Sequence, residues 1–188
     1  LSFVQAIRDA MDDDGIYVPD MTQIGYVSRF AMPFYQPRTC LDPGYQGTLG
    51  WCMPTAIGAK VAFPDRQVLA LSGDGGFMFN VQELATAVQH KINLVTVVFN
   101  DGAYGNVRRM QKEYHGERFI ATELQNPDFM KLADAFGLHG VRAHTADELR
   151  VAIESGFSTD GPTLIEVPVG EMPNPASVAW MMSKVRGN

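Results

Sequence analysis

Two short runs of apolar residues constrain the fold of this chain more than any other feature of its sequence. They cover residues 68–72 and 92–99, and each has the length of a strand and is almost continuously apolar. Such runs are typical of strands that are buried on both faces of a parallel sheet. Residues 163–168 form a third run, and residues 15–18 and 140–142 are weaker candidates. We therefore expect a mainly parallel sheet.

Helical patterns separate these runs. Asn80 is placed to cap a helix whose apolar residues recur with helical spacing, and Glu83 is placed to close a capping box. The pair Asn126-Pro127 is predicted to begin a second helix, and Thr145 with Glu148 forms a capping pair for a third. Strands that alternate with helices predict an α/β fold with a doubly wound, mainly parallel sheet and helices on both faces.

Length, charge and cysteine content narrow the classes of protein that this chain can be. Its 188 residues fit one domain, so we assign residues 1–188 to a single unit. The net charge of -6 and the lack of a basic run argue against a nucleic-acid partner. No apolar stretch approaches a membrane span of about 18 residues, and no signal peptide is recognisable. The 2 cysteines are too few for a disulfide scaffold, so we predict a cytoplasmic protein.

Both of the strongest predicted strands run into loops that are rich in glycine and carry a carboxylate. The first loop is Gly73-Asp74-Gly75-Gly76, and the second runs from Asn100 to Gly105. Glycines allow the backbone to approach a phosphate closely, but a neighbouring carboxylate would repel it. Mg²⁺ resolves this conflict, because it binds carboxylate, carbonyl and phosphate oxygens together. Taken separately, each loop is equally compatible with an ordinary turn that binds nothing.

The pairing of the two loops indicates a specific cofactor. Gly73-Asp74-Gly75, separated by residues 76–99 from Asn100-Asp101, closely resembles the thiamine diphosphate motif of thiamine-dependent enzymes. The order of segments along the whole chain resembles the diphosphate-binding (PP) domain of the acetolactate synthase and 2-oxo acid decarboxylase group. This resemblance implies the thiamine diphosphate-binding fold, with thiamine diphosphate and Mg²⁺ as cofactors. It also implies a lyase or transferase that decarboxylates or carboligates a 2-oxo acid substrate.

The resemblance also implies a set of site residues. The metal ligands would be Asp74, Asp101 and the backbone carbonyl of Ala103, with two diphosphate oxygens and a water completing six. Asp101 stands where the family usually has asparagine, and its extra negative charge should make the cofactor depend more strongly on the metal. Asn100 remains an alternative ligand. The cofactor-binding residues would be Thr22, Gln23, Gly47, Leu49, Gly73, Gly75, Gly76, Asn100 and Tyr104.

Four of these residues have defined or competing roles. The carbonyl of Gly47 and the amide of Leu49 would bind the aminopyrimidine ring, and the Leu49 side chain would wedge between the two rings of a bent cofactor. An ordinary core position is the alternative for Leu49. Thr22 and Gln23 would contact the diphosphate, and their alternative is an N-terminal helix cap.

The resemblance assigns no catalytic side chain to this chain. Relatives activate the cofactor with a glutamate from a separate pyrimidine-binding (PYR) domain, and no glutamate here maps to that role. We therefore expect the C-terminal part of a longer enzyme or one subunit of a split one, completed by a PYR domain in a homodimer or tetramer. An apolar patch at residues 49–53 should then be exposed in isolation. The alternatives are a non-catalytic or regulatory module that binds thiamine diphosphate and, less favoured, another nucleotide binder.

Overall fold

The structure is a computed structural model that describes the backbone of residues 1–186 and the side chains of residues 1–180. Its centre is a sheet of five strands in the order β1-β2-β3-β5-β4, and all neighbouring strands run parallel. The strands are β1 (Ile16–Pro19), β2 (Val68–Gly73), β3 (Val95–Asn100), β4 (His139–Arg142) and β5 (Thr163–Pro168). The predicted parallel sheet is confirmed, including the two weaker strand candidates.

Helices cover both faces of the sheet, so the doubly wound α/β fold is also confirmed. One hydrophobic cluster joins α1 (Ser2–Asp9), α2 (Gln23–Ala31) and α8 (Ala146–Phe157) to one face. A second cluster joins α3 (Cys52–Ala62), α4 (Asp74–Phe79), α5 (Glu83–Gln89) and α7 (Phe129–Phe136) to the other. The short 3₁₀ helix η1 covers Gly44–Gln46.

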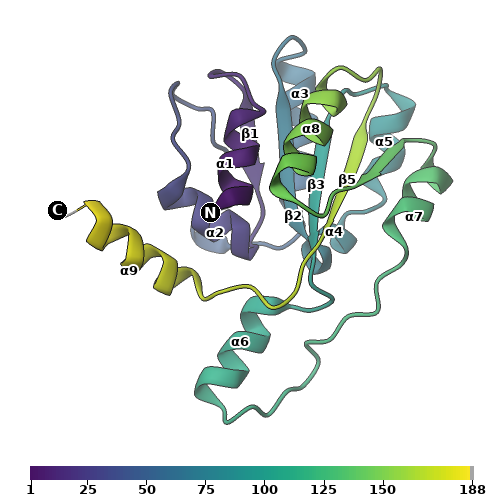
Figure 1. Ribbon diagram of the computed structural model, residues 1–188. Coiled ribbons are helices and arrows are strands. Elements are labelled where there is room, and N and C mark those ends of the chain that lie inside the picture. The colour runs from purple at the N-terminus through teal and green to yellow at the C-terminus, as the bar shows by residue number, and fades with distance from the viewer. Residues whose placement is uncertain (187–188) are drawn as a thin grey trace.

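Two helices extend beyond the layers. Figure 1 shows α6 (Gly105–Tyr114) below the sheet, past the carboxyl end of β3, and α9 (Pro175–Arg186) at the lower left. Within the described residues, no helix is both long and apolar enough to cross a membrane.

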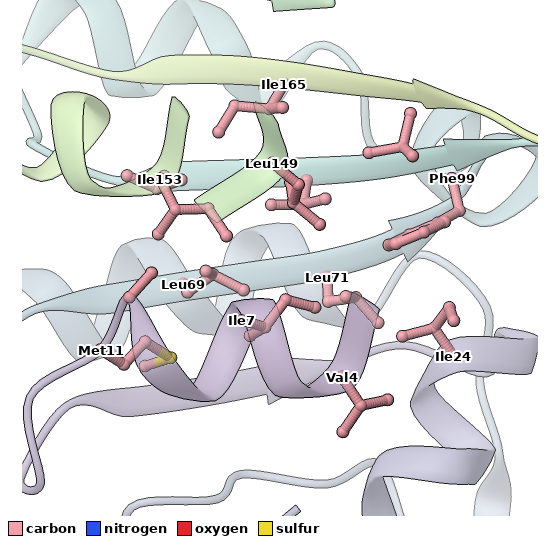
Figure 2. Close-up of a cluster of buried hydrophobic side chains, with 14 of the residues drawn as sticks. Val4, Ile7, Met11, Ile24, Leu69, Leu71, Phe99, Leu149, Ile153 and Ile165 are labelled. Atoms are coloured by element: carbon pink, nitrogen blue, oxygen red, sulfur yellow. The ribbon is translucent and has the colours of Figure 1, made fainter. Parts of the chain in front are cut away.

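The alternation of side chains along β2 divides the core between the two faces. Leu69 and Leu71 point into the first cluster, where Figure 2 shows them facing Ile7 of α1. Val68 and Ala70 point into the second cluster. All five side chains are buried, and each fully buried Leu, Ile or Val contributes about 1.5–3 kcal/mol of transfer free energy. β2 is therefore anchored to the core through side chains on both of its faces.

The capping box predicted at Asn80 is wrong. The segment that contains Gly-Asp-Gly is itself helical as α4, so Asn80 lies at the C-terminal end of that helix. Its side chain donates to the carbonyl of Gly50 at 2.7 Å. The next helix begins at Glu83, whose carboxylate accepts a hydrogen bond from the Thr86 hydroxyl at 3.0 Å.

The helix predicted to begin at Asn126-Pro127 begins instead at Phe129. Asp128 is its N-cap, and its carboxylate accepts from the backbone amides of Met130 and Lys131 at 3.0 and 3.4 Å. Asn126 is thereby left outside the helix, and its side chain points to the predicted metal site.

The capping pair predicted at α8 is confirmed. The Thr145 hydroxyl accepts from the Glu148 amide at 3.2 Å, and the Glu148 carboxylate accepts from the His144 amide at 2.7 Å.

Candidate functional site

The candidate site lies at the carboxyl ends of β1, β2 and β3. A cavity of about 220 Å³ opens there, and it is lined by the loops after these three strands, by the segment before α3, and by part of α6. Every site residue proposed from the sequence except Asn100 lines this one cavity, which we call the main cavity. Those residues are Thr22, Gln23, Gly47, Leu49, Gly73, Asp74, Gly75, Gly76, Asp101, Ala103 and Tyr104.

Two carboxyl groups face each other in this cavity. Asp74 is 2% exposed, and its Oδ2 atom accepts hydrogen bonds from the Gly102 amide at 3.0 Å and from Nδ2 of Asn126 at 2.6 Å. Asp101 is partly buried, and its Oδ1 atom accepts from the Ala103 amide at 3.2 Å. The pair offers a cation two carboxylates from adjacent strand ends, which is the number that Mg²⁺ sites typically use.

Burial makes the charged forms of both carboxyl groups costly. It raises the pKa of Asp74, and hydrogen bonds only partly oppose this effect. Burial, and then the negative charge of Asp74, raise the pKa of Asp101 to about 6. Two close carboxylates that repel each other are stabilised in their charged forms by a cation between them. The residues present therefore fit a divalent metal.

Asn100 points away from the main cavity, although it is adjacent to Asp101. Its Nδ2 atom donates to Oε1 of Glu166 at 2.8 Å, and its Oδ1 atom accepts from Nδ2 of Asn126 at 3.0 Å. Successive side chains of a strand point to opposite sides, so only one member of the pair can face the cavity. This arrangement supports Asp101, and not Asn100, as the metal ligand.

Three glycines of the site lie where a larger residue would collide. A Cβ atom on Gly75 would lie 2.6 Å from Cε1 of Tyr104, and one on Gly105 would lie 2.4 Å from Oδ2 of Asp101. A Cβ atom on Gly76 would lie 3.0 Å from a carboxylate oxygen of Asp20. The backbone after β2 therefore approaches both neighbouring loops closely, and α4 begins there with its first residues lining the cavity.

Gln23 has a polar atom without a partner at the cavity. The residue is 6% exposed, and its Oε1 atom is buried with no hydrogen-bond partner within the described part of the chain. Thr22 occupies the N-cap position of α2, but its side chain makes no capping hydrogen bond. The capping alternative is thus met by the position of Thr22 but not by a hydrogen bond of its side chain.

Leu49 lies at the mouth of the main cavity and is 36% exposed, so it is not a core residue. Gly47, two residues earlier, has a φ of 56°, which favours glycine. The exposed patch expected at residues 49–53 is narrower than predicted, because Cys52 and Met53 are 0% and 1% exposed. Both pack into the second hydrophobic cluster as the first turn of α3.

The sequence did not single out Asp20 as a functional residue. Asp20 is 1% exposed and directly follows β1, and its carboxylate accepts from the Gly50 amide at 2.8 Å and from the Ser72 hydroxyl at 3.2 Å. Burial raises its pKa. It therefore ties the Gly47 to Gly50 segment to the end of β2. A carboxylate at a strand end was the available signal, the same one that identified Asp74.

The described part of the chain matches a known family and known proteins. Residues 20–167 match the family model described as "Thiamine pyrophosphate enzyme, C-terminal TPP binding domain". The chain is 39% identical over 172 residues to the acetolactate synthase isozyme 2 large subunit of Escherichia coli (strain K12), covering 91% of this chain and 31% of that protein. It is 37% identical over 171 residues to an acetolactate synthase of Bacillus subtilis (strain 168), covering 90% and 30%.

A solved structure shows the same fold. The thiamine diphosphate-dependent 4-hydroxybenzoylformate decarboxylase of Rhodococcus jostii RHA1 has a TM-score of 0.83 at 32% identity, and the match covers 92% of this chain and 33% of that one. The chain therefore spans about a third of the length of these relatives.

Proposed function

Because residues 20–167 match the C-terminal TPP binding domain of the thiamine pyrophosphate enzymes, the chain belongs to this family, and we propose that it binds thiamine diphosphate through Mg²⁺. It would form half of the active site of an acetolactate synthase-like enzyme that decarboxylates or carboligates a 2-oxo acid. In this proposal, residues 1–188 act as the PP domain at the C-terminal end of a larger, cytoplasmic enzyme.

The convergence of the predicted residues on the main cavity is the observation that carries this proposal. Among the described residues, the lining includes three carboxyl groups, those of Asp20, Asp74 and Asp101, and no Lys, Arg or His side chain. A diphosphate alone would be repelled by this lining, because like charges at close range disfavour each other. A diphosphate with Mg²⁺ fits it, since the cation is attracted by the same carboxylates that repel the anion.

The metal and the diphosphate would be held by the loops after β2 and β3. The Asp74 and Asp101 carboxylates and the Ala103 carbonyl are the proposed metal ligands. The backbone amides of Gly75 and Gly76, at the start of α4, would donate to diphosphate oxygens. Thr22, Gln23, Gly73 and Tyr104 line the same part of the cavity and complete the proposed diphosphate site.

The aminopyrimidine ring would lie against the Gly47 to Leu49 segment. The Gly47 carbonyl would accept from the ring's amino group, the Leu49 amide would donate to the ring, and the Leu49 side chain would hold the cofactor bent. Bound thiamine diphosphate supplies the electron sink for the loss of the substrate's carboxylate, while the protein supplies orientation and charge placement.

The main cavity contains no glutamate among its described lining residues. We therefore propose that the activating glutamate comes from a PYR domain, supplied by the rest of the polypeptide or by another subunit of a homodimer or tetramer. This proposal leaves the chain with cofactor-binding residues but no catalytic side chain of its own.

The test is a thermal-melting experiment with thiamine diphosphate, with and without Mg²⁺, on the chain alone and with its PYR domain. A ligand at one hundred times its Kd stabilises the folded state by about 2.7 kcal/mol, which for a domain of this size raises Tm by about 5–10 °C. We expect this rise only when Mg²⁺ and cofactor are both present. Asp74→Asn should abolish it, whereas Asp134→Asn, which removes an exposed charge on α7, should not.

A second assay separates an enzyme from a non-catalytic module. With the PYR domain present, the proposed enzyme releases CO₂ from a 2-oxo acid such as pyruvate, and a binding module binds the cofactor without releasing CO₂. An assembled protein whose melting does not respond to Mg²⁺ and thiamine diphosphate would refute the proposed function.

A further inference from the structure

A continuous chain of hydrogen bonds connects Glu166 to Asp74 behind the main cavity. Oε1 of Glu166 accepts from Nδ2 of Asn100 at 2.8 Å. Nδ2 of Asn126 then donates both to Oδ1 of Asn100 at 3.0 Å and to Oδ2 of Asp74 at 2.6 Å. Asn100, Asn126 and Glu166 do not line the cavity, so they lie behind the carboxylate and do not face a ligand.

The two carboxylates at the ends of this chain fix the orientation of both amides. An ionised carboxylate only accepts hydrogen bonds, so Asn100 must turn its NH₂ group toward Glu166 and its oxygen toward Asn126. Asn126 must therefore donate in both directions, and it can do so because its amide nitrogen carries two hydrogens. No other assignment of these two amides satisfies both carboxylates.

The consequence for Asp74 is a fixed orientation of its carboxylate. Its Oδ2 atom accepts from Asn126 and from the Gly102 amide, which leaves Oδ1 as the oxygen to face a cation. The loop that carries Asn126 is itself held by main-chain hydrogen bonds, from the Leu124 amide to the Gly102 carbonyl at 2.8 Å and from the Tyr104 amide to the Thr122 carbonyl at 2.8 Å.

We propose that Asn126 is a positioning residue that sets the geometry of the metal site by orienting Asp74, and this rests on the proposed function of the main cavity. Asn100 serves as the relay between Asn126 and the buried Glu166, and not as a metal ligand. This assignment explains why the motif keeps an amide at position 100 although position 101 carries a carboxylate. A carboxylate at position 100 could still accept from Asn126, but it would face the Glu166 carboxylate with no hydrogen to donate to it.

The ion's own requirements make this role measurable. Mg²⁺ demands near-ideal octahedral geometry, whereas Ca²⁺ accepts flexible and irregular coordination. Loss of a group that orients a ligating carboxylate typically weakens metal binding about 10–100-fold. A carboxylate released from Asn126 should therefore lose Mg²⁺ affinity much more than Ca²⁺ affinity.

The experiment measures thiamine diphosphate binding by the assembled protein, with its PYR domain, in titrations with Mg²⁺ and separately with Ca²⁺. For Asn126→Ala we expect the Mg²⁺ concentration at half-saturation to rise about 10–100-fold, and the Ca²⁺ value to rise much less. Asn126→Ser should give the same result. This second variant replaces the alanine variant if that one does not fold, because the serine hydroxyl can hold a water in the vacated space.

Asn93→Ala is the matched control. Asn93 is also half-buried, and its Nδ2 atom also makes two hydrogen bonds, to the carbonyls of Phe157 and Thr159 at the opposite end of the sheet. The Asn93→Ala variant should lose stability as Asn126→Ala does, but it should keep the wild-type preference for Mg²⁺ over Ca²⁺. The inference is overturned if an Asn126 variant binds Mg²⁺ within twofold of wild type, or loses affinity for both ions equally. If the wild-type protein itself shows no metal-dependent binding, the proposed function and this inference fail together.

Discussion

Replacing Asp101 by Asn should make the metal-free protein more stable and its cofactor less dependent on the metal. Asp101 is partly buried and lies beside Asp74, and burial together with that neighbouring charge raises its pKa to about 6. Asparagine keeps the size of the side chain and can still accept from the Ala103 amide, but it carries no charge. The substitution therefore isolates the effect of one negative charge in the main cavity.

The sign and size of the stability change follow from the raised pKa. Since the folded protein binds the Asp101 proton more tightly than the unfolded chain, stability falls as the pH rises from about 4 to about 6 and stays reduced above that. In a fully buried group, a pKa shift of this size would lower the free energy of unfolding by about 3 kcal/mol. Because Asp101 is partly exposed, we expect a loss of about 1–2 kcal/mol. Asp101→Asn should therefore melt about 2–8 °C higher than wild type at pH 8 without metal, and about equally at pH 4.

The same charge should affect ligand binding. If Asp101 binds Mg²⁺ as proposed, the ion competes with the proton on Asp101, so the apparent Mg²⁺ affinity of the wild-type protein should fall about tenfold between pH 8 and pH 5. Asp101→Asn should lose most of this pH dependence. Mg²⁺ should strengthen thiamine diphosphate binding by some factor in the wild-type protein, and this factor should be about tenfold or more smaller in the variant. The reason is that the repulsion between one carboxylate charge and the diphosphate at close range costs about 1–4 kcal/mol.

Calorimetric melting from pH 4 to pH 8 and isothermal titration with and without Mg²⁺ measure these quantities. A variant that is no more stable than wild type at pH 8 in the absence of metal would show that the Asp101 charge does not destabilise the folded protein. Equal pH dependence of the Mg²⁺ affinity in both proteins would show that Asp101 is not the group that competes with the metal for a proton.

Three further substitutions test other parts of the site. Leu49→Ala should lower the unfolding free energy by only about 1 kcal/mol, since the side chain is 36% exposed, but it should weaken cofactor binding about 10–30-fold in isothermal titration. Gly75→Ala should cost about 1–3 kcal/mol in urea unfolding, because the new Cβ atom would lie 2.6 Å from the Tyr104 ring and displace it. Arg142→Ala should cost about 1–2 kcal/mol in the same assay, because it removes the 2.8 Å ion pair of the buried Glu166, and partial exposure of the Arg142 side chain limits the loss.

The features that the sequence predicted correctly depend on local patterns. The strand runs that include Val68 and Thr163 needed only continuous apolar character, and the Thr145 and Glu148 capping pair lies within one helical turn. The prediction at Asn80 was wrong because the preceding glycine-rich segment forms the helix α4. The close packing of this helix against Gly50 and the neighbouring loops is a tertiary contact that no local pattern indicates.

The features that the sequence missed depend on contacts between distant segments. The Asp20 carboxylate binds the Gly50 amide across 30 positions of the chain, and Asn126 binds Asp74 across 52. A local pattern cannot pair such residues, and the Asn-Pro sequence at position 126 suggested a helix start instead. The family motif located the cavity because it names residues that meet only in the folded protein. It also named Asn100, which lies behind the cavity, but it did not name Asp20 or Asn126.

A crystal structure of the assembled protein with thiamine diphosphate and Mg²⁺ would show directly whether the main cavity holds the metal and the cofactor. We expect one Mg²⁺ ion in the main cavity, bound by the Asp74 and Asp101 carboxylates and the Ala103 carbonyl at about 2.1 Å, with the diphosphate beside Gly75. A cofactor bound elsewhere, or a metal ion bound through the Asn100 side chain in place of Asp101, would contradict this expectation.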